Sequence, residues 1–183
     1  MAALALWAPG LRAQVGLASG TATVALTATK AASVSLSLPA GTSATLPGTL
    51  VIGPNDFAPI TVTTAWEVDP QRTAAVSLVA YFQQPARALA SASAAIPASA
   101  VLGRVPSGGP KGFAPFVGAP ISGGNAVAGA AGGTLVLFTQ PIAGANAIGG
   151  RSDNLQMRID LTGAPELPAG SYTGILNLLV ITQ

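Results

Sequence analysis

Apolar side chains stand at every second position along much of this chain, and this period favours β-strands over helices. The alternation is clearest in four segments: TATVALTAT (residues 21–29), SVSLSL (33–38), ITVTTAWEV (60–68) and NLQMRIDLT (154–162). Successive side chains of a strand point to opposite faces of a sheet, so each segment would bury one face and expose the other. The last of these would turn its odd-numbered residues inward and Gln156, Arg158 and Asp160 outward.

Turn residues separate the predicted strands. The tetrapeptide DPQR (69–72) places Asp and Pro at the first and second positions of a type I turn. Because it joins 60–68 to AAVSLVAYF (74–82), we expect a hairpin with Trp66 and Phe82 on its core face. A shorter strand is predicted at TLVIG (49–53), after a loop that is rich in turn residues, LPAGTSATLPG (38–48).

The segment LPAGSYTGILNLLVITQ (167–183) reads as a turn followed by a strand that is apolar on both faces. One face would carry Ile175, Leu179 and Ile181, and the opposite face Leu176, Leu178 and Val180. Such a strand is covered on both sides, either deep in a sandwich or at an interface. Tyr172 is expected to anchor the corner before this strand, like the tyrosine corner of immunoglobulin-like domains.

Residues 84–133 differ from the rest, because Ala, Gly, Ser and Pro dominate them and only 99–105 has a strand pattern. They form either a long loop or an insertion that contains short strands of weak signal. The strand pattern returns at GTLVLFTQ (133–140). Together these features predict an all-β protein, an antiparallel immunoglobulin-like (Greek-key) β-sandwich of about 8–9 strands with a long Gly/Ala/Pro-rich loop region.

The start of the chain bears on compartment. MAALALWAPGLRAQ (1–14) resembles the apolar and cleavage regions of a secretory signal, with cleavage expected after Ala13 or Ala18. An ordinary apolar N-terminus is the alternative. We therefore expect a signal-peptide-like segment at 1–13 and a single β-sandwich domain at 14–183, secreted to the periplasm or the extracellular cell surface. No stretch has the length and continuous apolar character of a transmembrane helix.

Composition argues against catalysis. The chain of 183 residues has no His and no Cys, which excludes Ser-His-Asp and Cys-His nucleophile arrangements and most zinc sites. Glu67 and Asp69 are two residues apart, but Asp69 is better explained by its turn and Glu67 by a solvated strand face. The sequence thus predicts no enzyme, no cofactor and no metal site. A net charge of +2 without a basic cluster predicts no nucleic-acid partner.

Two short segments contain oxygen ligands of the kind that Ca²⁺ takes, GPND (53–56) and RSDN (151–154). Each has too few carboxylates to form a site alone, so turn chemistry is the favoured interpretation. For ligand binding, the candidates are Tyr81, on the outer parity of its strand, and Phe113 and Phe116 in the loop KGFAPF (111–116). They would offer rings to a glycan or a surface partner; packing beneath the long loop is the alternative.

The two ends of the chain resemble secreted bacterial pilin-type and spore-coat-U-like β-sandwich proteins. The resemblance is carried by the signal-like start, the Thr-rich first strand TATVALTAT and the C-terminal LPAGSYTGILNLLVITQ. It implies a cell-surface structural subunit that polymerises by lending a strand to its neighbour. The expected donor is residues 14–29, and the expected acceptor is the groove beside the C-terminal strand. The alternative function is a secreted, non-catalytic binding module that uses residues 84–133.

Overall fold

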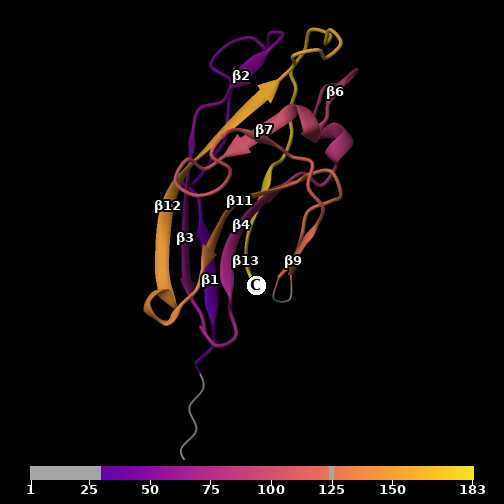
Figure 1. Ribbon diagram of the computed structural model, residues 1–183. Helices are drawn as coiled ribbons and strands as arrows, with labels where there is room; N and C mark the ends of the chain where they lie inside the picture. The colour runs from indigo at the N-terminus through magenta and orange to yellow at the C-terminus, as the bar shows by residue number, and fades with distance from the viewer. Residues whose placement is uncertain (1–29, 124–125) are drawn as a thin grey trace, which may run out of the picture. The chain divides into compact units, whose positions relative to one another are not determined.

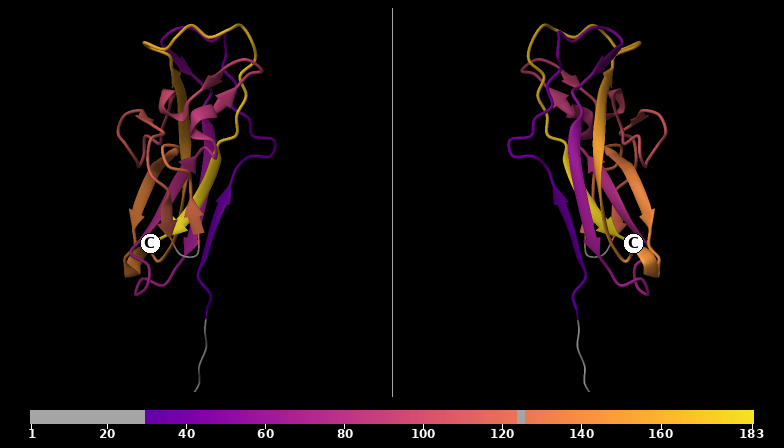
Figure 2. Two further views of the ribbon diagram at one scale, coloured as in Figure 1. Left: turned by 90° about the vertical axis from the view of Figure 1, so that its right-hand side faces the viewer. Right: turned by 90° about the vertical axis from the view of Figure 1, so that its left-hand side faces the viewer.

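The structure, a computed structural model, describes residues 30–123 and 126–183, and the predicted strand at 21–29 lies outside them. Strands form two facing layers, and every strand pair is antiparallel (Figures 1 and 2). The chain is all-β, as its alternation predicts, and its architecture is consistent with a β-sandwich. The immunoglobulin-like, Greek-key connectivity stays a prediction.

The first layer is a sheet with the strand order β1-β3-β12-β7-β8, and β2 also pairs with β12. Its strands are β1 (Ser33–Ser37), β2 (Pro54–Asp56), β3 (Ile60–Glu67), β7 (Val101–Arg104), β8 (Ala114–Pro115) and β12 (Ile148–Asp160). The second layer has the order β11-β4-β13. Its strands are β4 (Ala75–Tyr81), β11 (Thr134–Pro141) and β13 (Asn177–Thr182).

The inward faces of the two sheets form one apolar core. Along β12, Leu155, Met157 and Ile159 are buried and the residues between them are less so, which confirms the predicted alternation. These side chains meet core residues of the second sheet such as Leu78 and Val180. The core draws mostly on Val, Leu, Ile and Ala, so close approach of the sheets rests on small and branched side chains.

The predicted hairpin between residues 60–68 and 74–82 is wrong. The turn itself forms, with the Asp69 carboxylate accepting a hydrogen bond from the Gln71 amide at 2.9 Å. The strands it joins lie in different sheets, because β3 pairs with β1 and β12 while β4 pairs with β11 and β13. The turn therefore carries the chain from one layer to the other.

The C-terminal strand β13 is covered on both faces, as its sequence predicts. Leu178 and Val180 pack into the main core, whereas Leu179 and Ile181 pack on the outer side of the sheet. The cover on that side comes from the hairpin of β9 (Ile121–Gly123) and β10 (Ala126–Ala128), which contributes Ile121 and Ala126 to the second cluster. Part of the Ala- and Gly-rich region is thus a structural lid on this sheet.

Short elements account for much of residues 84–133. The region contains β5 (Leu89–Ala90), β6 (Ala95–Ile96), β7, β8, β9 and β10, with two 3₁₀ turns at Pro85–Arg87 and Ala98–Ala100; a third, Gly144–Asn146, precedes β12. The strand predicted at 99–105 is present as β7, whereas the strand predicted at 49–53 is absent from the structure. None of the helices among the described residues is long and apolar enough to cross a membrane.

Candidate functional site

An apolar groove opens between the two sheets along the side where β1 and β13 form their edges. One wall is residues 38–53, the strap, which leaves β1 and stands out from the sandwich (Figure 2). The other wall is residues 162–176, the return loop, which leads into β13. The groove holds about 1000 Å³, at the upper end of ligand-site volumes.

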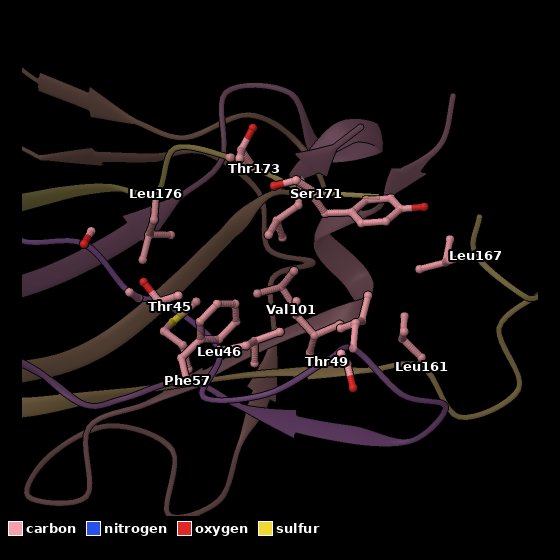
Figure 3. Close-up of a pocket in the computed structure, with 18 of the residues that line it drawn as sticks. Thr45, Leu46, Thr49, Phe57, Val101, Leu161, Leu167, Ser171, Thr173 and Leu176 are labelled. Carbon is pink, nitrogen blue, oxygen red and sulfur yellow. The ribbon is translucent and has the colours of Figure 1, made fainter. Parts of the chain in front are cut away.

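Apolar side chains from several elements converge on the groove. Figure 3 shows Leu46 of the strap, Phe57, Val101 of β7 and Leu176 of the return loop around the same space. The floor is the upper part of the core, with Ile60, Phe82, Leu155, Met157 and Ile159. Glu166 is the only charged residue among the described residues that line it.

The rim of the groove exposes large apolar side chains to solvent. Among the described residues, four of the eight exposed large hydrophobic side chains lie on its lining: Leu38, Val51, Ile52 and Ile175. Ile52 and Ile175 are the extreme cases, 73% and 78% exposed. Single exposed apolar residues are ordinary, but four on the lining of one groove make it a candidate binding surface.

The extent of the groove follows from where β1 and β13 end. β1 lies against β13, which closes that part of the sandwich edge. Beyond Ser37 the chain leaves the sheet, and before Asn177 the C-terminal strand has not yet begun. The strap and the return loop diverge over this interval, so the core lies open between them.

Both walls carry unpaired backbone. Residues 43–50 of the strap and residues 174–176 of the return loop form no backbone hydrogen bond with any other described residue. Each such N–H and C=O group is a donor or acceptor that folded proteins normally pair. An added strand would satisfy these groups.

Backbone and side-chain hydrogen bonds hold the strap only near its ends. The amide of Thr42 bonds to the Pro39 carbonyl at 3.2 Å. At the other end, the buried Asn55 side chain accepts from the Val51 amide at 2.9 Å and donates to the carbonyls of Val51 at 2.8 Å and Gly53 at 2.7 Å. The side-chain amide of Asn55 is therefore engaged in hydrogen bonds with the adjacent backbone.

The return loop is fixed at its middle. Tyr172 donates its hydroxyl hydrogen to the Pro168 carbonyl at 2.9 Å, which confirms the predicted corner. Thr173 and Ala90 exchange two backbone hydrogen bonds, of 2.8 and 3.1 Å. Next to them, Gly174 runs so close to the chain that a β-carbon there would lie 1.9 Å from the Ala88 carbonyl oxygen. Only glycine allows this approach.

The aromatic candidates from the sequence do not gather at this groove. Phe116 is fully buried and packs edge-on against Phe82, with ring centroids 5.1 Å apart, so it belongs to the core rather than to a surface loop. Tyr81 is half-buried and packs with the cluster beneath the β9–β10 hairpin. The role of Tyr81 in ligand binding stays a prediction.

Phe113 lies between two guanidinium groups. Arg104 and Arg158 approach its ring centroid at 4.5 and 4.2 Å, so cation–π contacts engage the ring that a sugar would need. Arg158 also donates to both carboxylate oxygens of Asp56, at 2.6 and 2.9 Å. These hydrogen bonds hold the pKa of Asp56 below its ordinary value and raise the pKa of Arg158. Through these contacts, Phe113 in the loop before β8 is held against Arg104 of β7 and Arg158 of β12, and Arg158 is held by Asp56 of β2.

The two segments weighed as calcium ligands have other partners. Asp153 is 4% exposed and lies in a strand rather than a turn; Arg151 donates to its carboxylate at 2.6 and 2.7 Å, and Ser107 also donates to it. Asp56 is engaged by Arg158. Among the described residues, no three potential metal ligands come together.

Sequence reasoning placed the acceptor beside the C-terminal strand, and the groove includes Leu176 and Leu178 there. It missed the strap, which it treated as a turn-rich loop followed by a strand at 49–53. A signal was present, because Ala44, Leu46, Gly48 and Leu50 continue a period of two through that loop.

Comparison with known proteins adds no relative from which a function could be transferred. No protein-family model, curated protein or solved structure matches this chain.

Proposed function

We propose that this protein is a secreted or cell-surface structural subunit that assembles into fibres or pili by strand exchange. The observation that carries the proposal is the apolar groove with unpaired backbone along both walls. A strand that enters such a groove pairs its backbone with the walls and buries alternate side chains on the floor. The groove is therefore an acceptor site for an extended segment.

The unpaired walls favour a peptide strand over a small apolar ligand. A lipid chain would cover Phe57 and Leu176, but it has no amide groups to pair with residues 43–50. It would also remove water from those backbone groups, which costs free energy when they stay unpaired. A strand covers the same apolar floor and satisfies the backbone at the same time.

Residues 21–29 of another copy suit this groove. Their sequence, TATVALTAT, alternates apolar and polar side chains and carries no charge. Nine residues in a strand span about 30 Å, close to the roughly 26 Å that the eight residues 43–50 would span when fully extended. The donor region stays as the sequence predicted it, residues 14–29, with 21–29 as its pairing part.

Geometry favours donation between copies over closure within one chain. β1 begins at Ser33, paired with Glu67, while the groove lies beyond the opposite end of β1, near Ile60. A second copy delivers the same segment without reversing the chain.

Secretion and a surface location are part of the proposal. They are supported by the signal-like residues 1–13 and by the resemblance to pilin-type and spore-coat-U-like proteins. The absence of His and Cys from the sequence fits a structural rather than a catalytic role. The alternative, a glycan- or partner-binding module in residues 84–133, has no comparable support, because contacts within the protein already engage Tyr81, Phe113 and Phe116.

Light scattering after size-exclusion chromatography, with negative-stain electron microscopy, tests the proposal. The full chain and residues 14–183 should form ladders or filaments, and a chain that lacks residues 14–29 should stay monomeric. Val24→Asp with Leu26→Asp should abolish assembly, because charges would enter the apolar floor. Thr23→Asp with Ala25→Asp, on the opposite face, is the matched control and should still assemble. A stable monomer from the unaltered chain would refute strand exchange.

A further inference from the structure

The strap has the side-chain pattern of a strand but no strand partner. Ala44, Leu46 and Leu50 are half-buried and line the groove, whereas Thr45, Pro47, Gly48 and Thr49 are exposed. The backbone bends at Pro47 and Gly48, which interrupts the pattern between Leu46 and Leu50. A two-residue period in burial is the pattern of a strand with one face on a core. In the described chain, the segment is unpaired because β1 has already ended and β13 lies across the groove.

We infer that the strap is a conditional strand: it becomes a β-strand when the donor enters the groove, and it pairs through residues 44, 46, 48 and 50. This inference rests on the proposed function, since it concerns how the acceptor holds the incoming segment. It goes further by stating that one wall of the site acquires its secondary structure only on assembly, and by assigning which backbone groups do the pairing.

The pairing edge follows from Pro47. In a strand, the N–H and C=O of one residue point to the same side, and those of the next residue point to the other side. Pro47 has no amide hydrogen, so the edge made by residues 45, 47 and 49 cannot pair fully. The edge made by residues 44, 46, 48 and 50 has every donor, and Ala44 and Leu46 also place their side chains towards the groove.

Glycines with positive φ lie near both ends of the strap. Gly41 and Gly53 have φ values of +70° and +106°, in the region that glycine adopts without strain. Asn55 clamps the second end to β2, and the turn at Pro39–Thr42 fixes the first. Gly48, at the middle, has no atom within 4 Å of the place a β-carbon would occupy, so the backbone there is free to settle against a partner.

Residue-resolved amide hydrogen exchange tests the inference. The protein is the full chain with Val24→Asp and Leu26→Asp, whose own donor is disabled, and the probe is a synthetic peptide of residues 20–30. On binding, the amides of Ala44, Leu46, Gly48 and Leu50 should gain at least about tenfold protection. Those of Thr45 and Thr49 should change less than about twofold. The same peptide with Val24→Asp and Leu26→Asp is the control and should protect none of them.

A matched pair of proline substitutions asks the same question by affinity. Gly48→Pro removes an amide on the proposed pairing edge and should weaken peptide binding about two- to tenfold, the effect of one hydrogen bond. Thr49→Pro removes an amide on the other edge and should leave binding within about twofold. In both variants, the new proline and the residue before it favour the extended backbone that the paired strap needs.

The outcomes separate this inference from the proposed function. Binding with alternating protection and a selective loss in Gly48→Pro supports both. Binding with uniform or no protection of residues 44–50, or with equal effects of the two prolines, overturns the strap pairing and leaves strand exchange standing. Failure of the peptide to bind, together with a monomeric unaltered chain, overturns both.

Discussion

At the scale of single residues, two ion pairs, Arg151–Asp153 and Arg158–Asp56, belong to contacts that hold neighbouring segments of the described chain together. Asp153 faces inward from β12 beside the core, where Arg151 pairs with it and also stacks 4.1 Å from the centroid of the Phe138 ring. Ser107 ties the loop after β7 to the same carboxylate. The sequence RSDN indicated a turn, because Asp and Asn are common turn residues. In the structure these residues belong to β12, because each of them pairs with a residue of β3.

Removing the Asp153 carboxylate should be costly. Asp153→Ala leaves the partly buried Arg151 guanidinium without its partner, and the free energy of unfolding should fall by about 3–5 kcal/mol. The measurement is urea denaturation. Replacing both residues, Arg151→Met with Asp153→Leu, should cost less than the single change, because no charge is left stranded. An equal or greater loss in the double variant would contradict this account.

The Asp56–Arg158 pair predicts a pH response on the acid side. The folded-state pKa of Asp56 is lowered, chiefly by hydrogen bonds from Arg158, so the pair's contribution to stability is complete above about pH 4 and fades as pH falls through the folded-state pKa. Carbon-detected NMR titration should show the Asp56 pKa below 3.8, and Arg158→Gln should return it towards 3.8.

Asp160 is the internal control for that titration. Its pKa is lowered chiefly by hydrogen bonding with Thr162, and Arg158 contributes least. Its pKa should therefore stay largely in place in Arg158→Gln. Equal movement of the Asp56 and Asp160 titrations would show that the guanidinium acts through general charge rather than through its hydrogen bonds to Asp56.

At the scale of elements, alternation predicted strands well and their partners poorly. β3 and the second half of β12 lie where the two-residue period places them, and both faces of β13 are covered as its composition requires. The wrong hairpin at 60–82 has a plain cause: DPQR encodes a turn, but a turn does not state whether the chain returns to the same sheet. The missing strand at 49–53 has local propensity without a neighbour to pair with.

Short elements escaped prediction for a different reason. Apart from the predicted β7, the strands within residues 84–133 are two or three residues long, too short for a two-residue period to show above a background of Ala and Gly. Their existence depends on contacts with the main sheets. The β9–β10 hairpin is held over β4 and β13, around Val79 and Ile181, rather than by its own sequence.

The β9–β10 hairpin should therefore matter as a cover. Replacing residues 121–128 with a Gly/Ser linker would expose Val79 and Ile181, which are 0% and 2% exposed. We expect increased binding of an apolar dye and self-association that does not need residues 14–29. Val127→Ser, at an exposed position of the same hairpin, is the control and should change the free energy of unfolding by less than about 0.5 kcal/mol. An unchanged dye signal after removal of the hairpin would contradict the covering role.

At the scale of the whole molecule, residues 31–183 make one compact unit with a shared core. A chain that lacks residues 1–29 should thus unfold in a single cooperative transition. Trp66 is then the only tryptophan, and it is 6% exposed with its indole N–H bonded to the Asn146 carbonyl at 2.9 Å. Its emission should be blue-shifted and should follow the circular-dichroism transition. Separate transitions would show that the two sheets do not share one core.

Only one of the two walls of the candidate groove could be predicted from the sequence. Its C-terminal wall could be predicted, because β13 is apolar on both faces. The strap and the opening could not, because a groove is a gap between sheets and depends on where β1 stops relative to β13. A sequence specifies strand faces locally, whereas the space between two edges is set by the packing of the whole sandwich.

The placement of the groove has a consequence for growth. The described chain enters the sandwich at one end of β1, and the groove opens past the other end. Copies joined by strand exchange are then related head to tail, a heterologous contact that does not close on itself. Such a polymer would have two chemically distinct ends, one with an empty acceptor groove and one with an unpaired donor segment. Under the proposed strand exchange, elongation would be directional, and whatever occupies an end would control the length.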